Sequence, residues 1–217
     1  MASGRGLILA DSTALLRGYE EVQEKLEQQL KGKYGLDVQV YAKGGLTFAP
    51  RYGRKSTYEG VLEGILKDWP GQPEYVVLLS GGNDMYDYEQ KTLDEQYDNV
   101  RIALAITSVA ARLWYQRIPS LIVVGGSSKV FQYTGNKAVV YDRRAQMVRS
   151  VAQRMMAAVP LGGCSLVSGI AELMELRADV VDPIGHYGGA AAYAKFLHAL
   201  SLFAFTARTR SFDRSRL

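Results

Sequence analysis

Short apolar runs of strand length alternate with longer segments of helical periodicity along this 217-residue chain. The runs end in glycine or polar residues, and the longer segments carry apolar residues three and four positions apart. Strands are predicted at 6–10, 36–42, 74–80, 120–126 and 164–169, and helices near 13–32, 56–67, 92–116, 138–158 and 187–207. This alternation predicts an α/β fold, a parallel sheet of about five strands with helices on both faces.

The composition gives no reason to divide the chain into two domains. Hydrophobic residues make up 47% of the sequence and charged residues 22%, as in ordinary globular proteins. We therefore predict a single domain over residues 1–207 and a basic tail over 208–217. The tail has four arginines and one aspartate. A solvated chain end explains it most simply, and nucleic-acid binding stays a weaker alternative.

The first residues and the cysteine content favour a cytoplasmic or otherwise intracellular protein. The apolar stretch Leu7–Ala10 is far shorter than the core of a signal peptide, and the single Cys164 cannot form a disulfide within the chain. The helix near 187–207 approaches the length of a membrane span, but Lys195 and His198 interrupt it. We expect a helix of the core or of a homodimer contact, and no membrane span.

Small or polar residues follow four of the predicted strands. The segments are Asp11-Ser12-Thr13, Gly44-Gly45-Leu46-Thr47, Gly81-Gly82-Asn83-Asp84 and Gly125-Gly126-Ser127-Ser128. The carboxyl ends of parallel strands meet at one rim of the sheet, where open α/β sheets bind ligands. Asp182 and His186 come just before the last predicted helix. A serine, a histidine and an acid are therefore available at one rim.

The order of these segments resembles that in the SGNH or GDSL-type serine hydrolases, which are esterases with a flavodoxin-like three-layer α/β/α sandwich. ADS at 10–12 resembles the family's first motif, GGLT at 44–47 its glycine segment, GGND at 81–84 its G-x-N-D motif, and DPIGH at 182–186 its late Asp/His motif. Each match is weak alone, and LLSGGND is the most specific. The ordered set covers nearly the whole chain.

The resemblance implies a role for each matched residue. Ser12 would be the nucleophile, His186 the general base and Asp182 the acid that orients the histidine. The oxyanion hole would consist of the Ser12 N–H, the Gly45 N–H and the Asn83 side chain. The implied reaction is hydrolysis of a small-molecule ester with a short acyl or O-acetyl group through an acyl-enzyme intermediate. We expect no cofactor. We also expect no metal, because two scattered histidines and one cysteine make no standard zinc centre without carboxylates.

Two departures from the family's pattern leave alternatives open. Ala10 replaces the usual glycine, and three residues instead of two separate Asp182 from His186. Gly185 can absorb the extra residue, because glycine tolerates positive φ, and Asp179 is a second candidate acid. A non-catalytic small-molecule or carbohydrate-binding domain is the alternative function. A nucleotide- or flavin-binding protein fits the element order, but no phosphate-binding glycine motif supports it.

Side chains near the same rim have two further predicted roles. Asp11 and Asp84 are predicted to be structural and to tie turns through backbone hydrogen bonds. Aromatic residues and a methionine in the rim loops are candidates to line an acyl or sugar site. They are Phe48, Tyr52, Met85, Tyr86, Tyr88, Phe131 and Tyr133.

Overall fold

The computed structural model describes residues 5–12, 22–50, 56–80, 82–85, 95–125, 135–159, 161–169 and 186–209. Strands and helices alternate in it as predicted, with small differences at their ends. The elements are β1 (Gly6–Ala10), α1 (Val22–Tyr34), β2 (Val38–Ala42), α2 (Tyr58–Asp68), β3 (Val76–Leu79), the 3-10 turn η2 (Asn83–Met85), α3 (Glu95–Tyr115), β4 (Ser120–Val124), α4 (Gly135–Ala158), β5 (Cys164–Ser168) and α5 (Gly189–Arg208). The first part of the helix predicted at 13–32 lies outside the described residues.

The strands form one parallel sheet in the order β2-β1-β3-β4-β5. Ile8 of β1 lies opposite Val40 of β2 on one side and opposite Val77 of β3 on the other. The chain thus adds β2 to one edge of β1 and then crosses over to place β3 on the opposite edge. The gap between the carboxyl ends of β1 and β3 is the switch point of a flavodoxin-like sheet, where such folds bind ligands.

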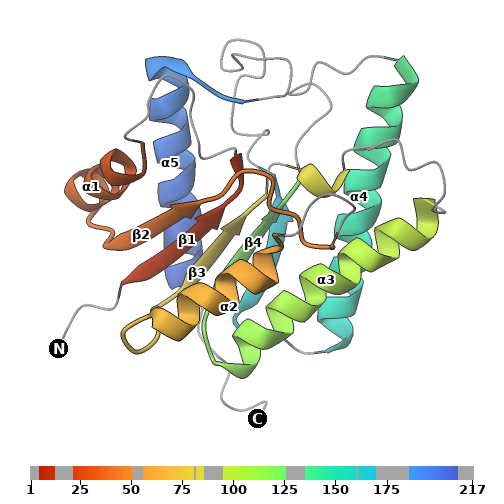
Figure 1. The fold of residues 1–217 in the computed structure, drawn as a ribbon, viewed down its shortest axis with the longest axis horizontal. Coiled ribbons are helices and arrows are strands. Elements are labelled where there is room, and N and C mark those ends of the chain that lie inside the picture. Colours follow the sequence, from red (N-terminus) through yellow and green to blue (C-terminus); the bar gives the residue numbers. More distant parts are fainter. Residues whose placement is uncertain are drawn as a thin grey trace.

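Helices cover both faces of the sheet and complete a three-layer α/β/α sandwich (Figure 1). Helices α1 and α5 pack on one face, where α5 contacts β1, β3 and β4. Helices α2, α3 and α4 lie on the other face, and α3 and α4 pack closely against each other. The inner strands β1, β3 and β4 are buried at every position, because each has strands on both sides and helices above and below.

Helix α5 is the one helix among the described residues that is long and apolar enough to cross a membrane by length and composition. Its inward side, which includes Phe196, Leu200 and Ala204, is buried against the sheet. His198 lies on the exposed side, and its ring centroid is 6.5 Å from that of Tyr34 in α1. The prediction of a core helix is confirmed, and the homodimer contact stays a prediction.

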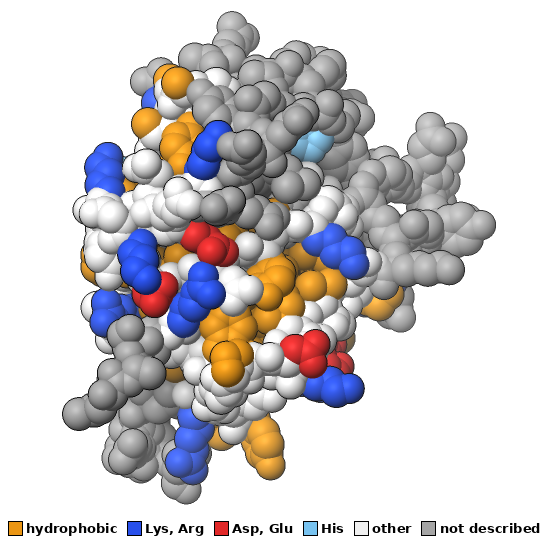
Figure 2. Space-filling view, turned by 60° about the vertical axis from the view of Figure 1, so that its left-hand side comes forward, with side chains coloured by type: hydrophobic (Ala, Val, Ile, Leu, Met, Phe, Trp, Pro, Cys, Tyr) orange, Lys and Arg blue, Asp and Glu red, His pale blue; other side chains and the backbone are white. Residues whose placement is uncertain are grey.

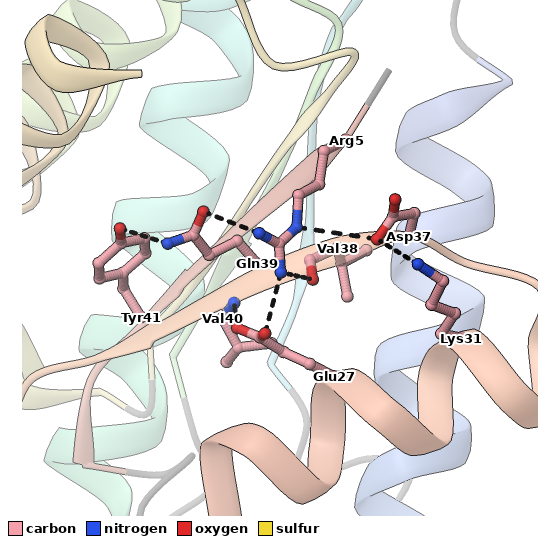
Figure 3. A network of polar contacts seen from close by, with 8 residues as sticks. All are labelled: Arg5, Glu27, Lys31, Asp37, Val38, Gln39, Val40 and Tyr41. Atoms are coloured by element: carbon pink, nitrogen blue, oxygen red, sulfur yellow. Dashed lines mark hydrogen bonds and ion pairs between the residues drawn. The ribbon is translucent and has the colours of Figure 1, made fainter. Parts of the chain in front are cut away.

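Side chains form hydrogen bonds with the backbone N–H and carbonyl groups at the outer edge of β2. Glu27 of α1 accepts hydrogen bonds from the Val40 N–H at 2.7 Å and from Arg5 at 3.0 Å, and Arg5 also donates to the Val38 carbonyl at 3.1 Å (Figure 3). Asp37 lies 3.8 Å from the same guanidinium. Figure 2 views the molecule from this side and shows acidic and basic side chains close together. An open strand edge can pair with another chain, and these contacts protect the edge of β2 from such pairing.

Gly6 at the start of β1 lies against the ring of Tyr75. A β-carbon on Gly6 would lie 2.3 Å from Cζ of Tyr75, whose side chain is only 1% exposed. We expect Gly6→Ala to lower the free energy of unfolding by about 1–3 kcal/mol, because overpacking forces the ring or the strand to move. Denaturant unfolding measures the change.

Gly64 in α2 is a matched control, because nothing lies within 4 Å of the β-carbon that alanine would add there. Gly64→Ala should raise the free energy of unfolding by about 0.5–1 kcal/mol through helix propensity. Adding Tyr75→Leu should recover part of the loss in Gly6→Ala. Equal destabilisation by the two glycine substitutions would contradict the packing argument.

Candidate functional site

Ser12 lies two residues after the end of β1, at the carboxyl edge of the sheet. The preceding residue, Asp11, still runs beside β3, because its N–H donates to the Leu79 carbonyl at 3.2 Å. Asp11 is 1% exposed, whereas Ser12 is half-buried. The candidate nucleophile therefore lies at the switch point between β1 and β3, with part of its surface open to solvent.

The chain after β2 forms a glycine loop, residues 44–50, beside the end of β1. The Lys43 N–H donates to the Ala10 carbonyl at 3.0 Å, which fixes the start of the loop next to β1. Gly45 has a φ of +75°, a conformation that glycine adopts without strain and other residues rarely adopt. The candidate oxyanion-hole residue thus occupies a turn that favours glycine.

Asn83 joins the glycine loop to the segment that carries Ser12. Its side-chain nitrogen donates to Oδ2 of Asp11 at 3.1 Å and to the Leu46 carbonyl at 3.0 Å. The opposite orientation of the amide would set its oxygen against a carboxylate and a carbonyl, so the hydrogen bonds fix the orientation. Both amide hydrogens are engaged, and an oxyanion bound at this nitrogen would have to replace one of these acceptors.

Asp84 anchors the far half of the glycine loop. Its carboxylate accepts hydrogen bonds from the Phe48 N–H at 2.7 Å and the Ala49 N–H at 3.1 Å, and its side chain is 1% exposed. Hydrogen bonds to a carboxylate are stronger than those between neutral groups. The predicted structural role of Asp84 is confirmed, but the backbone that it holds belongs to a loop more than thirty residues earlier in the chain.

Tyr58 at the start of α2 is a fully buried member of the site that the sequence analysis missed. Its hydroxyl donates to the Leu79 carbonyl at 2.6 Å, and its ring stacks on Phe48 with centroids 4.5 Å apart. Burial, and after it the Asp11 and Asp84 carboxylates, raise the pKa of Tyr58 well above its ordinary value. The phenol therefore stays neutral and remains a donor. Nothing in the local sequence distinguishes a tyrosine at the start of a helix as a buried hydrogen-bond donor of this kind.

The prediction that Phe48 and Met85 line the substrate site is wrong. The two side chains are 2% and 1% exposed and belong to the core. The Phe48 ring is held by the stack on Tyr58, and its backbone N–H is held by Asp84. The other residues proposed for this lining lie outside the described residues.

His186 lies just before α5, and its side chain is half-buried beside the buried Tyr187. Asp182, the alternative acid Asp179 and Gly185 lie outside the described residues. The structure thus brings the segments of Ser12, Gly45 and Asn83 together at the switch point. The pairing of Ser12 with His186 and an acid stays a prediction.

Among the described residues, no group of three or more His, Cys, Asp or Glu side chains is placed to hold a metal ion. Cys164 begins β5, far along the sheet from Ser12, and is half-buried. Its thiol accepts a hydrogen bond from Ser120 at 3.0 Å and donates to the Ala110 carbonyl at 3.4 Å. Burial raises the pKa of this thiol, which favours its protonated form.

Several solved structures of ester hydrolases resemble this chain. A GDSL-like lipase from Bacteroides thetaiotaomicron aligns with a TM-score of 0.55 and 15% identity over 94% of this chain and 89% of its own. A carbohydrate acetylesterase family member from Sinorhizobium meliloti aligns with a TM-score of 0.59 and 13% identity over 95% of this chain and 99% of its own. The acetylxylan esterase Axe2 from Geobacillus stearothermophilus aligns with a TM-score of 0.56 and 12% identity over 93% of this chain and 94% of its own.

This chain has the fold of the GDSL hydrolases. No protein-family model matches the sequence, and no curated protein sequence matches it at a significant level. The five-stranded parallel sheet and these structural neighbours confirm the predicted α/β/α sandwich. Because a GDSL-hydrolase fold can carry different functions, the function has to be argued from the residues at the switch point.

Proposed function

We propose that this protein is a serine esterase that hydrolyses carboxylic esters with a short acyl or O-acetyl group. The observation that supports this most is the junction at Asn83. There, one amide nitrogen contacts both Asp11, the residue before the candidate nucleophile, and Leu46, the residue after the candidate oxyanion-hole glycine. The junction holds the nucleophile segment, the glycine loop and η2 in fixed relation at the ligand-binding edge of the sheet.

In the proposed mechanism, the Ser12 hydroxyl attacks the ester carbonyl while His186 takes its proton. The electron pair of the carbonyl moves to its oxygen, and the C–O bond to the leaving alcohol then breaks as His186 returns the proton to that alcohol. Water activated by His186 releases the acid from the acyl-enzyme. Asp182 would keep the imidazole oriented through both steps.

The negative charge on the carbonyl oxygen would be met by the Ser12 and Gly45 N–H groups and by the Asn83 amide. Donors held in place before the reaction stabilise such a charge without reorganisation, and each is typically worth about 2.7–4 kcal/mol of transition-state stabilisation. Asn83 would exchange one of its present acceptors, Asp11 or Leu46, for the oxyanion.

The short acyl group is the part of the proposal that draws on the comparisons. An acetylxylan esterase and a carbohydrate acetylesterase family member share this fold, which supports a short acyl group in the substrate. Phe48 and Met85 are committed to the core and leave fewer apolar side chains to bind a long chain. An acetyl or other short acyl group needs little apolar surface.

A fluorophosphonate probe tests the proposal without knowledge of the natural substrate. We expect one adduct, located at Ser12 by mass spectrometry, in the native protein and none in heat-denatured protein, Ser12→Ala or His186→Ala. Circular dichroism would verify that each variant is folded. A folded, unlabelled native protein would favour the non-catalytic binding domain, which Ala10 and the altered spacing of Asp182 and His186 support. Ligand binding that persists in Ser12→Ala would then identify that function.

A further inference from the structure

Arg101 of α3 holds the end of the glycine loop. Its Nη1 donates to the Pro50 carbonyl at 2.8 Å, and its Nη2 donates to Oδ1 of Asp98 at 2.9 Å. One guanidinium therefore connects the last described residue of the loop to a carboxylate on its own helix. The planar fork of arginine can make both bonds at once, which a lysine ammonium cannot do with the same geometry.

The Asp98 carboxylate is itself fixed by α4. Nη2 of Arg144 lies 2.5 Å from Oδ2 of Asp98, and Nε of Arg144 donates to Oδ1 of Asn99 at 3.1 Å. Arg144 is 5% exposed and Asp98 is 7% exposed. A buried charge without its partner is strongly unfavourable, so Asp98 cannot turn away from Arg144 at low cost. Arg101 thus has a rigid support that comes from two packed helices.

We propose that Arg101 is a positioning residue for the glycine loop and, through it, for the Gly45 N–H; this inference rests on the esterase function proposed above. The loop backbone is held at the Leu46 carbonyl by Asn83, at Phe48 and Ala49 by Asp84, and at the Pro50 carbonyl by Arg101. Arg101 is the one anchor among these that comes from α3. The α3–α4 pair is thereby linked to the oxyanion hole.

The loss of this anchor acts on the chemical step. A loop that moves more places the Gly45 N–H less accurately against the developing oxyanion, which raises the barrier to acylation. Among the described residues, Arg101 contacts the Pro50 carbonyl and the Asp98 carboxylate, so we expect its loss to lower kcat and to leave KM unaffected. A purely structural arginine would change stability and leave kcat of the folded protein unaltered.

Arg112 provides a matched control on the same helix. Its side chain is 33% exposed, against 32% for Arg101, and it pairs with Glu63 of α2 at 3.2 Å. Arg112→Met removes a similar ion pair from α3 and leaves the glycine loop with all its anchors. Arg101→Lys tests the geometry, because it keeps the charge and loses the fork.

The experiment compares Arg101→Met, Arg101→Lys and Arg112→Met with the native protein. Hydrogen exchange of the Phe48 and Ala49 amides reports on the loop. The rate of fluorophosphonate labelling at Ser12 and the kcat and KM for p-nitrophenyl acetate report on the chemistry. For Arg101→Met we expect faster exchange at both amides and about tenfold lower kcat and labelling rate at unchanged KM, the size of one lost charge-assisted hydrogen bond. Arg101→Lys should give exchange rates and a kcat between those of Arg101→Met and the native protein, and Arg112→Met should match the native protein. In a further variant, Arg101→Ala, free guanidinium should partly restore kcat.

If the native protein is labelled at Ser12, two outcomes would overturn the proposed role of Arg101 and leave the esterase proposal intact. The first is amide exchange in Arg101→Met that equals exchange in Arg112→Met. The second is faster exchange with unchanged kcat, which would make the anchor a structural contact only. A folded native protein without a Ser12 adduct would instead overturn the esterase proposal, and the catalytic role of Arg101 with it.

Discussion

Ser12→Ala is expected to lower kcat for ester hydrolysis by about 10⁴-fold or more, the scale seen when one member of a serine–histidine unit is removed. His186→Ala should have a similar effect, because the serine hydroxyl needs a base to become a nucleophile. The double variant should be no slower than either single one, since the two residues act in the same step. Initial rates with p-nitrophenyl acetate measure all three.

Ser108→Ala is the control for these variants. This serine is exposed on α3 and bonds to Glu59 at 3.3 Å, and its loss should leave kcat unchanged. Asp182→Asn and Asp179→Asn extend the same test to the acid of the triad: we expect a large loss of kcat in the first and a native rate in the second. The reverse result would transfer the role to Asp179. Independent, multiplicative losses from Ser12→Ala and His186→Ala would argue against a shared step.

The fold could be predicted from the sequence because its signals are local. Leu78 and Leu79 end β3, and Ser80 and GGND follow, so the strand, the turn and the position of Asn83 at the rim all come from adjacent residues. The positive φ of Gly45 is likewise a local requirement that glycine meets. The alternation of strands and helices restricts the sheet to few topologies, and the observed order β2-β1-β3-β4-β5 is one of them.

The contacts that hold the site could not be predicted, because they join residues that the sequence separates widely. Asp84 bonds to Phe48, and Arg144 bonds to Asp98, across 36 and 46 positions respectively. An aspartate in a turn and an arginine on a helix are both ordinary at a surface, and only packing makes them buried anchors. Phe48 misled the analysis for the same reason, since an aromatic residue in a rim loop has the same local pattern whether it faces a ligand or the core.

Two neighbouring residues hold the glycine loop at separate points along its backbone. Asn83 and Asp84 are consecutive residues of η2, yet they hold the loop from a carbonyl at one end and from two N–H groups at the other. The G-x-N-D segment therefore supplies one candidate oxyanion donor, the Asn83 side chain, and also holds the loop that carries another, the Gly45 N–H. A change at Asp84 should consequently affect both stability and catalysis.

Asp84→Ala is expected to lower the free energy of unfolding by about 3–5 kcal/mol, because it leaves two buried N–H groups without an acceptor at roughly 1–3 kcal/mol each. Asp84→Asn preserves the volume but can accept at only one of the two groups, since its NH₂ would meet the other N–H, so a smaller loss is expected. Urea unfolding measures both. Asp68→Ala, at an exposed aspartate of α2, should change stability by about 0.5 kcal/mol or less.

The kinetic effect of Asp84→Asn should exceed what its stability loss explains. If the variant remains mostly folded at the assay temperature, a loss of kcat of roughly tenfold or more must come from the folded protein, in which one of the two N–H anchors of the loop that carries Gly45 is lost. A variant that loses stability yet keeps native kcat would show that Asp84 supports only the core. Native stability together with reduced kcat would place Asp84 in the chemistry itself, which its burial beneath the loop argues against.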